Sequence, residues 1–208
     1  MGTSGKERVI AYVDGFNLYN GLKDNGFRRY SWLNLETLVL ELLKPQQELV
    51  GIKYFSSAID NNADRRARQI IYFDALSTVA RIQIILGIFQ KGKSQCQICG
   101  QVSHVNSEKM TDVNIATHML ADFYGDRFDM AMLISGDTDL VPPIRHINES
   151  GLSKRVLVAF PPGRVNDKIR NYAKGSLVIG RKKLADSQFE EKFQTAYGET
   201  LSRPTKWR

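Results

Sequence analysis

Two aspartates directly follow one of the most apolar stretches of the chain. The run 131–134 ends in a small turn, after which come Asp137, Asp139 and two prolines. A second apolar run, 9–13, ends at Asp14, and Asp112 opens a stretch with helical spacing. Carboxylates that lie close together repel one another unless some are protonated or a cation neutralises them. These four aspartates are therefore candidate ligands of a hard divalent ion such as Mg²⁺.

The elements that would position these acids alternate between strand and helix. Strands are predicted over 9–13, 50–59, 82–89, 130–134 and 156–160, with an edge strand at 177–179. Helices are predicted over 32–44, 63–79, 112–124 with Thr111 as N-cap, 142–148, and a short one capped by Asn166. Continuous apolar strands that alternate with helices are typical of a parallel sheet covered on both faces. We therefore expect a three-layer α/β/α domain with a mostly parallel central sheet.

The sheet would gather the acids only if its strand order allowed it. Ligands bind outside the carboxyl ends of parallel strands, and Asp14 and Asp137 both follow strand ends. Asp14 and Asp137 lie close together if the first and fourth strands are neighbours. Asp112 starts the helix that leads into the fourth strand, so it lies at the same edge of the sheet. Each acid also has a structural reading, as a helix cap, a turn residue or a partner of the helix dipole. Their joint placement favours a metal site that activates water against a phosphodiester.

The charge of the chain indicates an anionic partner. It has 208 residues and a formal net charge of +7, and nucleic acid is the commonest partner of such proteins. Arg65, Arg66 and Arg68 on the polar side of one predicted helix, with Lys91 and Lys93, are candidate phosphate contacts. No apolar run approaches the roughly 20 residues that span a bilayer. Only two cysteines are present, so a reducing cytoplasm is the expected compartment.

Three blocks make the chain recognisable. "VIAYVDGFNLYNGL", "KMTDVNIATHML" and "AMLISGDTDLVPPI" resemble, in order, the NYN domain family, in its LabA-like branch of the PIN-like metal-dependent ribonucleases. The resemblance covers 9 to about 178. It implies a PIN-like α/β/α fold and Mg²⁺- or Mn²⁺-dependent cleavage of RNA.

The resemblance also implies roles for individual residues. Its acidic positions match Asp14, Asp112, Asp137 and Asp139. Asn17, Ser135 and Thr138 match polar positions expected to contact the substrate or a metal-bound water. Many PIN nucleases carry a further glutamate in mid-chain, for which Glu108 and Asp60 are only loose candidates here.

The segment 91–107 interrupts the alternation and is predicted to be an inserted loop or hairpin. Its "CQICG" has the shape of half a zinc knuckle, with Cys96 and Cys99 as thiolate ligands and His104 as a third. A fourth ligand is missing, and Glu108 or a second copy of the chain could supply it, so a homodimer is a possible assembly. The alternative is a polar hairpin with two free thiols.

The predicted organisation is one nuclease domain over 1–180 and a basic, peripheral segment over 181–208. The predicted function is an endoribonuclease that cleaves single-stranded RNA. The alternative is a module on the same fold that binds RNA or a protein without cutting. A haloacid-dehalogenase phosphatase is excluded, because Phe16 stands where that chemistry needs a second aspartate. A nucleotide-binding switch is excluded by the lack of a Gly-x4-Gly-Lys-Ser/Thr loop.

Overall fold

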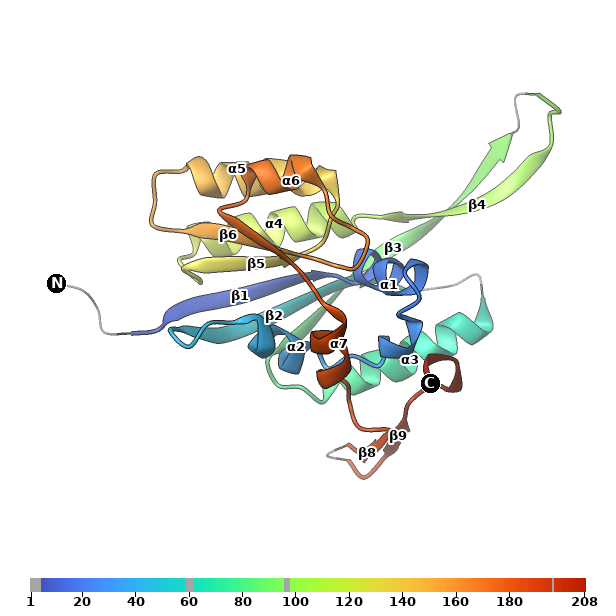
Figure 1. Cartoon of the computed structure of the whole chain (residues 1–208). Helices are drawn as coiled ribbons and strands as arrows, with labels where there is room; N and C mark the ends of the chain where they lie inside the picture. Colours follow the sequence, from blue (N-terminus) through green and yellow to red (C-terminus); the bar gives the residue numbers. More distant parts are fainter. Residues whose placement is uncertain (1–4, 59–61, 96–97, 196) are drawn as a thin grey trace.

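The computed structural model describes residues 5–58, 62–95, 98–195 and 197–208, and within 89–95 and 102–108 it describes the backbone alone. In these ranges a seven-stranded sheet has the order β4-β3-β2-β1-β5-β6-β7 (Figure 1). Its strands are β1 (Glu7–Asp14), β2 (Gln47–Ser57), β3 (Ile82–Gln95), β4 (Val102–Lys109), β5 (Met130–Ile134), β6 (Arg155–Phe160) and β7 (Gly175–Val178). Six of them are parallel, and only β4 is antiparallel to its neighbour. The predicted α/β class and mostly parallel sheet are confirmed.

Helices cover both faces of the sheet (Figure 1). One layer contains α1 (Gly15–Asp24), α2 (Leu35–Leu42), α3 (Ala63–Ser77) and α7 (Arg181–Asp186). The other contains α4 (Thr111–Tyr124), α5 (Val141–Glu149) and α6 (Asp167–Tyr172). Along β1, Val9, Ala11 and Val13 pack into the first layer, whereas Ile10 and Tyr12 pack into the second. This two-sided burial explains why the strand is apolar at successive positions.

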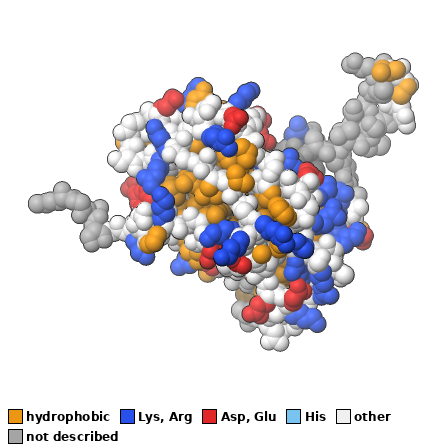
Figure 2. Space-filling view, viewed as in Figure 1, with side chains coloured by type: hydrophobic (Ala, Val, Ile, Leu, Met, Phe, Trp, Pro, Cys, Tyr) orange, Lys and Arg blue, Asp and Glu red, His pale blue; other side chains and the backbone are white. Residues whose placement is uncertain are grey.

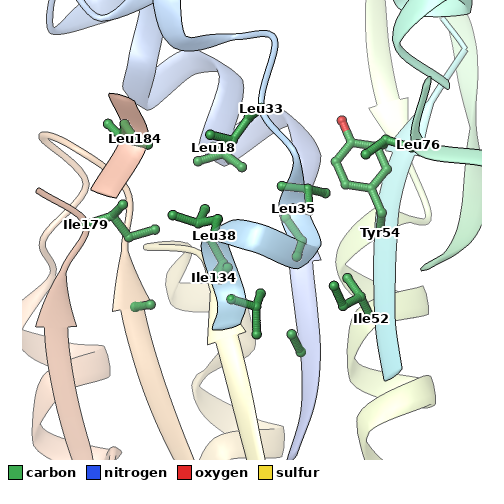
Figure 3. Packing of buried hydrophobic residues seen from close by; sticks show 14 of the residues in the cluster. Leu18, Leu33, Leu35, Leu38, Ile52, Tyr54, Leu76, Ile134, Ile179 and Leu184 are labelled. Atoms are coloured by element: carbon green, nitrogen blue, oxygen red, sulfur yellow. The ribbon is translucent and has the colours of Figure 1, made fainter. Parts of the chain in front are cut away.

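The core of the first layer is built from leucines of several helices (Figure 3). Leu18 of α1, Leu38 of α2 and Leu76 of α3 pack over Ile52 of β2 and Ile134 of β5, and all are at most 4% exposed. Full burial of one such side chain contributes about 1.5–3 kcal/mol. The amino-terminal half of α1 is thereby held against the sheet at the point where β1 ends.

Several element boundaries differ from the sequence prediction. The first predicted helix begins only at Leu35, because the Asn34 side chain accepts hydrogen bonds from the amides of Glu36 and Thr37. The expected N-cap role of Thr111 is wrong: Met110 precedes α4 with φ 77°, and Thr111 is the first helical residue, with a buried side chain. Helix α1, which follows Asp14 without a break, is not among the predicted helices.

The predicted insertion proves to be a hairpin. β3 continues past the predicted end of its strand to Gln95 and pairs with β4, and the two extend from the body of the molecule (Figure 1). The side chains of Lys91, Lys93 and His104, and the whole of Cys96, lie outside the described residues. Cys99 is described as exposed, with no disulfide in that part of the chain. The zinc hypothesis therefore remains a prediction.

The segment after residue 180 is not peripheral, contrary to expectation. It adds α7, the hairpin β8 (Lys192–Gln194) and β9 (Thr200–Ser202), and the short 3-10 helix η3 (Thr205–Trp207). Trp32 is fully buried, with ring centroids 5.5 Å from Phe189 and 6.3 Å from Trp207. Its indole nitrogen donates to the carbonyl of Glu190 at 2.8 Å. The aromatic residues of this segment complete the core of the first layer. The mostly polar composition of the segment gave no indication of this role.

Across the described ranges, none of the helices has the length and apolar character needed to cross a bilayer.

Candidate active site

Asp14 is fixed at the carboxyl end of β1 by two hydrogen bonds. One carboxylate oxygen accepts from the amide of Asn17 at 3.0 Å and thereby caps α1. The other oxygen accepts from the Ser135 hydroxyl at 2.9 Å. The side chain is only 4% exposed. Its orientation is therefore set by the protein before any ligand arrives.

The turn after β5 is tied to the same point. β1 and β5 are adjacent and parallel, with Val13 opposite Ile134, so the turn begins beside Asp14. The Ser135 hydroxyl accepts from the amide of Asp137 at 3.1 Å, and the Asn17 side-chain oxygen accepts from the amide of Gly136 at 3.0 Å. Asn17 and Ser135 therefore orient the acids. For Ser135, which is fully buried, this corrects the expected contact with substrate.

Two glycines of the recognised blocks sit where backbones approach closely. A Cβ at Gly15 would lie 2.7 Å from the carbonyl oxygen of Phe55, and a Cβ at Gly136 would lie 2.0 Å from that of Arg164. Neither distance can accommodate a side chain. The glycines next to the acids are thus required by packing at this edge of the sheet.

The acids line a pocket of about 260 Å³ at the carboxyl ends of β1 and β5. Its described lining is Asp14, Phe16, Asn17, Asn20, Met110, Thr111, Asp112, Asp137 and Arg164. We call it the acid pocket. Three of the four predicted aspartates meet here, whereas Asp139 is exposed and is not part of the lining. Thr138, expected to contact substrate, begins the 3-10 helix η2 (Thr138–Leu140) and is likewise outside the lining.

The position of Asp112 depends on an unusual backbone conformation. Met110 has a left-handed φ of 77° between β4 and α4, a conformation that non-glycine residues rarely adopt. It turns the chain so that Asp112 falls in the first turn of α4, facing the other acids. Partial burial, together with the smaller effects of the negative charges of Asp137, Asp14 and Asp139, raises the pKa of Asp112 to about 6.

The donor set fits a hard divalent cation, although the carboxylates are not yet gathered around one point. In the described ranges no three His, Cys, Asp or Glu side chains form a ready metal site. Carboxylate oxygens are nevertheless the ligands that Mg²⁺ prefers, completed by water and substrate phosphate. Burial and the neighbouring carboxylates both raise the pKa of Asp112, and a bound cation would favour the ionised form.

Arg164 is a functional candidate that the sequence analysis missed. It lies in the loop after β6, lines the acid pocket, and donates to the Asp24 carboxylate at 2.6 Å. Its Nε is buried and has no hydrogen-bond partner among the described residues. The available signal was its position just past the predicted strand 156–160, at the same sheet edge as the acids. An arginine that lines the same pocket as three aspartates is a candidate for holding a phosphate.

The predicted arginines of α3 lie outside the acid pocket. Arg65 and Arg66 are exposed and Arg68 is half-buried. Arg65 and Arg68 line a second hollow next to the acid pocket.

The electrostatics of Asp112 give a stability prediction for protein in EDTA. Its pKa is higher folded than unfolded, so the folded state binds more protons and loses stability as pH rises from about 4 through about 6. We expect Asp112→Asn to raise the melting temperature at pH 7.5 and to leave it nearly unchanged at pH 4. Melting curves of both proteins across this range would check it; a stabilisation that is independent of pH would contradict it.

The chain is similar to known proteins. The family model for the NYN domain matches residues 8–180. A curated relative, 6-hydroxy-3-succinoylpyridine 3-monooxygenase HspA of Pseudomonas putida (strain DSM 28022 / S16), is 26% identical over 174 residues, covering 67% of this chain and 55% of that protein. The chain thus spans about half the length of this relative.

A solved structure has a similar fold. It is a protein of unknown function from Vibrio parahaemolyticus RIMD 2210633, with a TM-score of 0.58 and 17% sequence identity. The match covers 91% of this chain and 100% of the other. At this identity the similarity concerns the fold alone.

Proposed function

This chain belongs to the NYN domain family, and from that premise we propose that it is an endoribonuclease that uses Mg²⁺ or Mn²⁺ to hydrolyse RNA. The observation that carries the proposal is the acid pocket, where Asp14, Asp112 and Asp137 line one cavity at the carboxyl end of a parallel sheet. Ligand sites of open α/β sheets lie at this edge. The net charge of +7 suits a polyanionic substrate.

Asp14, Asp112 and Asp137 would hold the cation. When bound, it would lower the pKa of a water molecule and offset negative charge on the phosphate. The residues of the chain supply the positioning. Asn17 and Ser135 fix the Asp14 carboxylate and the turn that carries Asp137. Preorganised groups of this kind need little rearrangement during reaction.

Arg164 has a separate role in the proposal. Arg164 lines the acid pocket, and its guanidinium would hold a non-bridging phosphate oxygen and orient the scissile bond. Asp139, exposed next to the pocket, contributes charge; we propose that it lies at the entrance rather than among the inner ligands.

The test is RNA cleavage by the purified chain. A short single-stranded RNA, labelled at one end, is incubated with Mg²⁺ or Mn²⁺ and in parallel with EDTA. We expect internal cleavage products in either metal and none in EDTA. RNA that is bound but never cut in both metals would overturn the enzymatic proposal and favour the alternative, a module that binds without cutting.

A further inference from the structure

A second hollow of about 230 Å³ lies beside the acid pocket. It is enclosed by α1, α3, the 3-10 helix η1 (Arg28–Tyr30) and η3 near the carboxyl terminus, which lies next to α3 (Figure 1). Phe16 and Asn20, four residues apart on α1, line both cavities. A ligand strand that passes over this shared wall would therefore occupy both.

The inner walls of the hollow are aromatic. Tyr19 of α1, Tyr54 of β2, Tyr72 of α3 and Trp207 of η3 line it together with Phe16. Trp207 is held in place by Tyr72, with ring centroids 5.8 Å apart and planes at 89°. Aromatic side chains are the usual platforms for unpaired bases, and one stacked base contributes about 1–3 kcal/mol.

The charged residues of the lining are all positive, and of these Lys23 lies 3.9 Å from a carboxylate oxygen of Asp24, outside the lining. The charged members of the lining are Lys23, Arg28, Arg65, Arg68 and Lys206, and no Asp or Glu is among the described lining residues. Side chains three apart on a helix share a face, which brings Arg65 and Arg68 together. Lys and Arg side chains gather over α3 in the space-filling view (Figure 2). Such a cluster of like charges is relieved by a bound anion.

The size of the hollow limits its ligand. Pockets that enclose drug-sized ligands are typically about 300–1,000 Å³, and this one is smaller. It suits a single flat ring system with anionic groups at its mouth. Ser31 also lines the hollow, and its buried hydroxyl has no hydrogen-bond partner among the described residues. After rotation about χ1 this hydroxyl could form a hydrogen bond with a polar atom at the edge of the ligand ring.

We propose that this hollow, the base pocket, holds one unpaired nucleobase of a single-stranded RNA. The flanking phosphate lies on Arg65, Arg68 and Lys206, and the next phosphodiester along the strand reaches the acid pocket. The assignment rests on the proposed ribonuclease function for the identity of the strand, but the binding that it describes requires no cleavage. Lys206 and Trp207 lie beyond the residues matched by the family model, so the carboxyl-terminal segment of this chain completes the pocket.

The first test measures RNA affinity without catalysis. Fluorescence anisotropy of a labelled short single-stranded RNA is followed in EDTA for wild type and Arg65→Glu/Lys206→Glu. The matched control, Arg127→Glu/Lys174→Glu, makes the same charge change at exposed positions before β5 and β7, at the opposite edge of the sheet. At about 0.15 M salt, where charges more than about 8 Å apart are largely screened, we expect the first variant to lose at least about tenfold in affinity and the control less than about twofold, because only the first variant removes phosphate contacts. Equal losses would overturn the base pocket.

The second test asks whether a base is recognised. A series of RNAs with one abasic nucleotide at successive positions should show a loss of affinity of about fivefold to a hundredfold at one position, as expected for one stacked base. Nucleoside monophosphate should compete better than tripolyphosphate. If every abasic position lowered the affinity equally and tripolyphosphate competed as well as the nucleoside monophosphate, the hollow would bind phosphate alone, and the proposal would be overturned. Equal affinity for fully double-stranded RNA would overturn it as well.

The outcomes separate the two proposals. If both binding tests behave as expected while no metal supports cleavage, the base pocket stands and the ribonuclease assignment fails. If RNA is cleaved but Arg65→Glu/Lys206→Glu binds RNA as well as the control variant does, the ribonuclease assignment stands and the base pocket is wrong.

Discussion

Asp137→Asn is expected to lower the rate of RNA cleavage by at least about a thousandfold, because the metal contribution to charge stabilisation, several kcal/mol, is lost and 1.36 kcal/mol is a factor of ten. The melting temperature should hardly change. In the native protein an Asp137 carboxylate oxygen accepts from the amide of Asp139 at 3.0 Å and caps η2. An asparagine oxygen can make the same bond, and both residues are good caps. A neutral amide is, however, a much poorer ligand for a hard cation.

The measurement is a time course with Mg²⁺ and with Mn²⁺, with melting curves and RNA affinity in parallel. Asp186→Asn, at the exposed end of α7, is the matched control and should keep wild-type activity. RNA affinity of the Asp137 variant should be unchanged or slightly higher, since one repulsive charge is gone. A stable variant with wild-type cleavage would remove Asp137 from the proposed mechanism.

The fold was predictable because its signals are local. Continuous apolar strands separated by helical patterns define a covered parallel sheet, and the resulting edge holds Asp14 and Asp137 whenever β1 and β5 are adjacent, as they are. The shared position of Asp112 follows from the short path between α4 and β5. These inferences need only the order of elements and the direction of the strands.

Other features depend on contacts between distant segments. Trp32 was assigned to a helix by its spacing, but its partners Phe189 and Trp207 lie more than 150 residues away in the chain. The same contacts turn an apparently peripheral segment into part of the core. Asp14 and Gly15 are residue types common in turns, but Asp14 caps α1 and Gly15 is its first residue, at a point where a Cβ would meet Tyr54 and Phe55. Local composition contains none of this information.

The base pocket illustrates the same limit at the level of function. Arg65 and Arg68 could be proposed as phosphate contacts from their charge and helical spacing. Their aromatic neighbours come from α1, β2 and η3, and only the tertiary fold brings these elements together. Arg164 was overlooked for a similar reason, since it lies in an irregular loop with no periodic signal.

Gly136→Ala is expected to reduce cleavage about a hundredfold, because misplacing reacting groups by about 1 Å has effects of that size. The added Cβ would lie 2.0 Å from the carbonyl oxygen of Arg164. The neighbour is backbone, so either the turn that carries Asp137 or the loop that carries Arg164 must move. Overpacking of this kind also destabilises proteins by about 1–3 kcal/mol, which should appear as a lower melting temperature.

The control for this variant is Gly51→Ala in β2, where a Cβ would meet nothing within 4 Å. It should keep both activity and stability, or gain up to about 1 kcal/mol from the stiffer unfolded chain. RNA binding in EDTA distinguishes a local shift from general unfolding. Because Gly136 does not line the base pocket, the Gly136 variant should keep most of its RNA affinity below its melting temperature, losing at most the contact of Arg164, while cutting slowly. Wild-type cleavage by a folded Gly136→Ala protein would mean that the close approach of these two loops does not determine the geometry of the acid pocket.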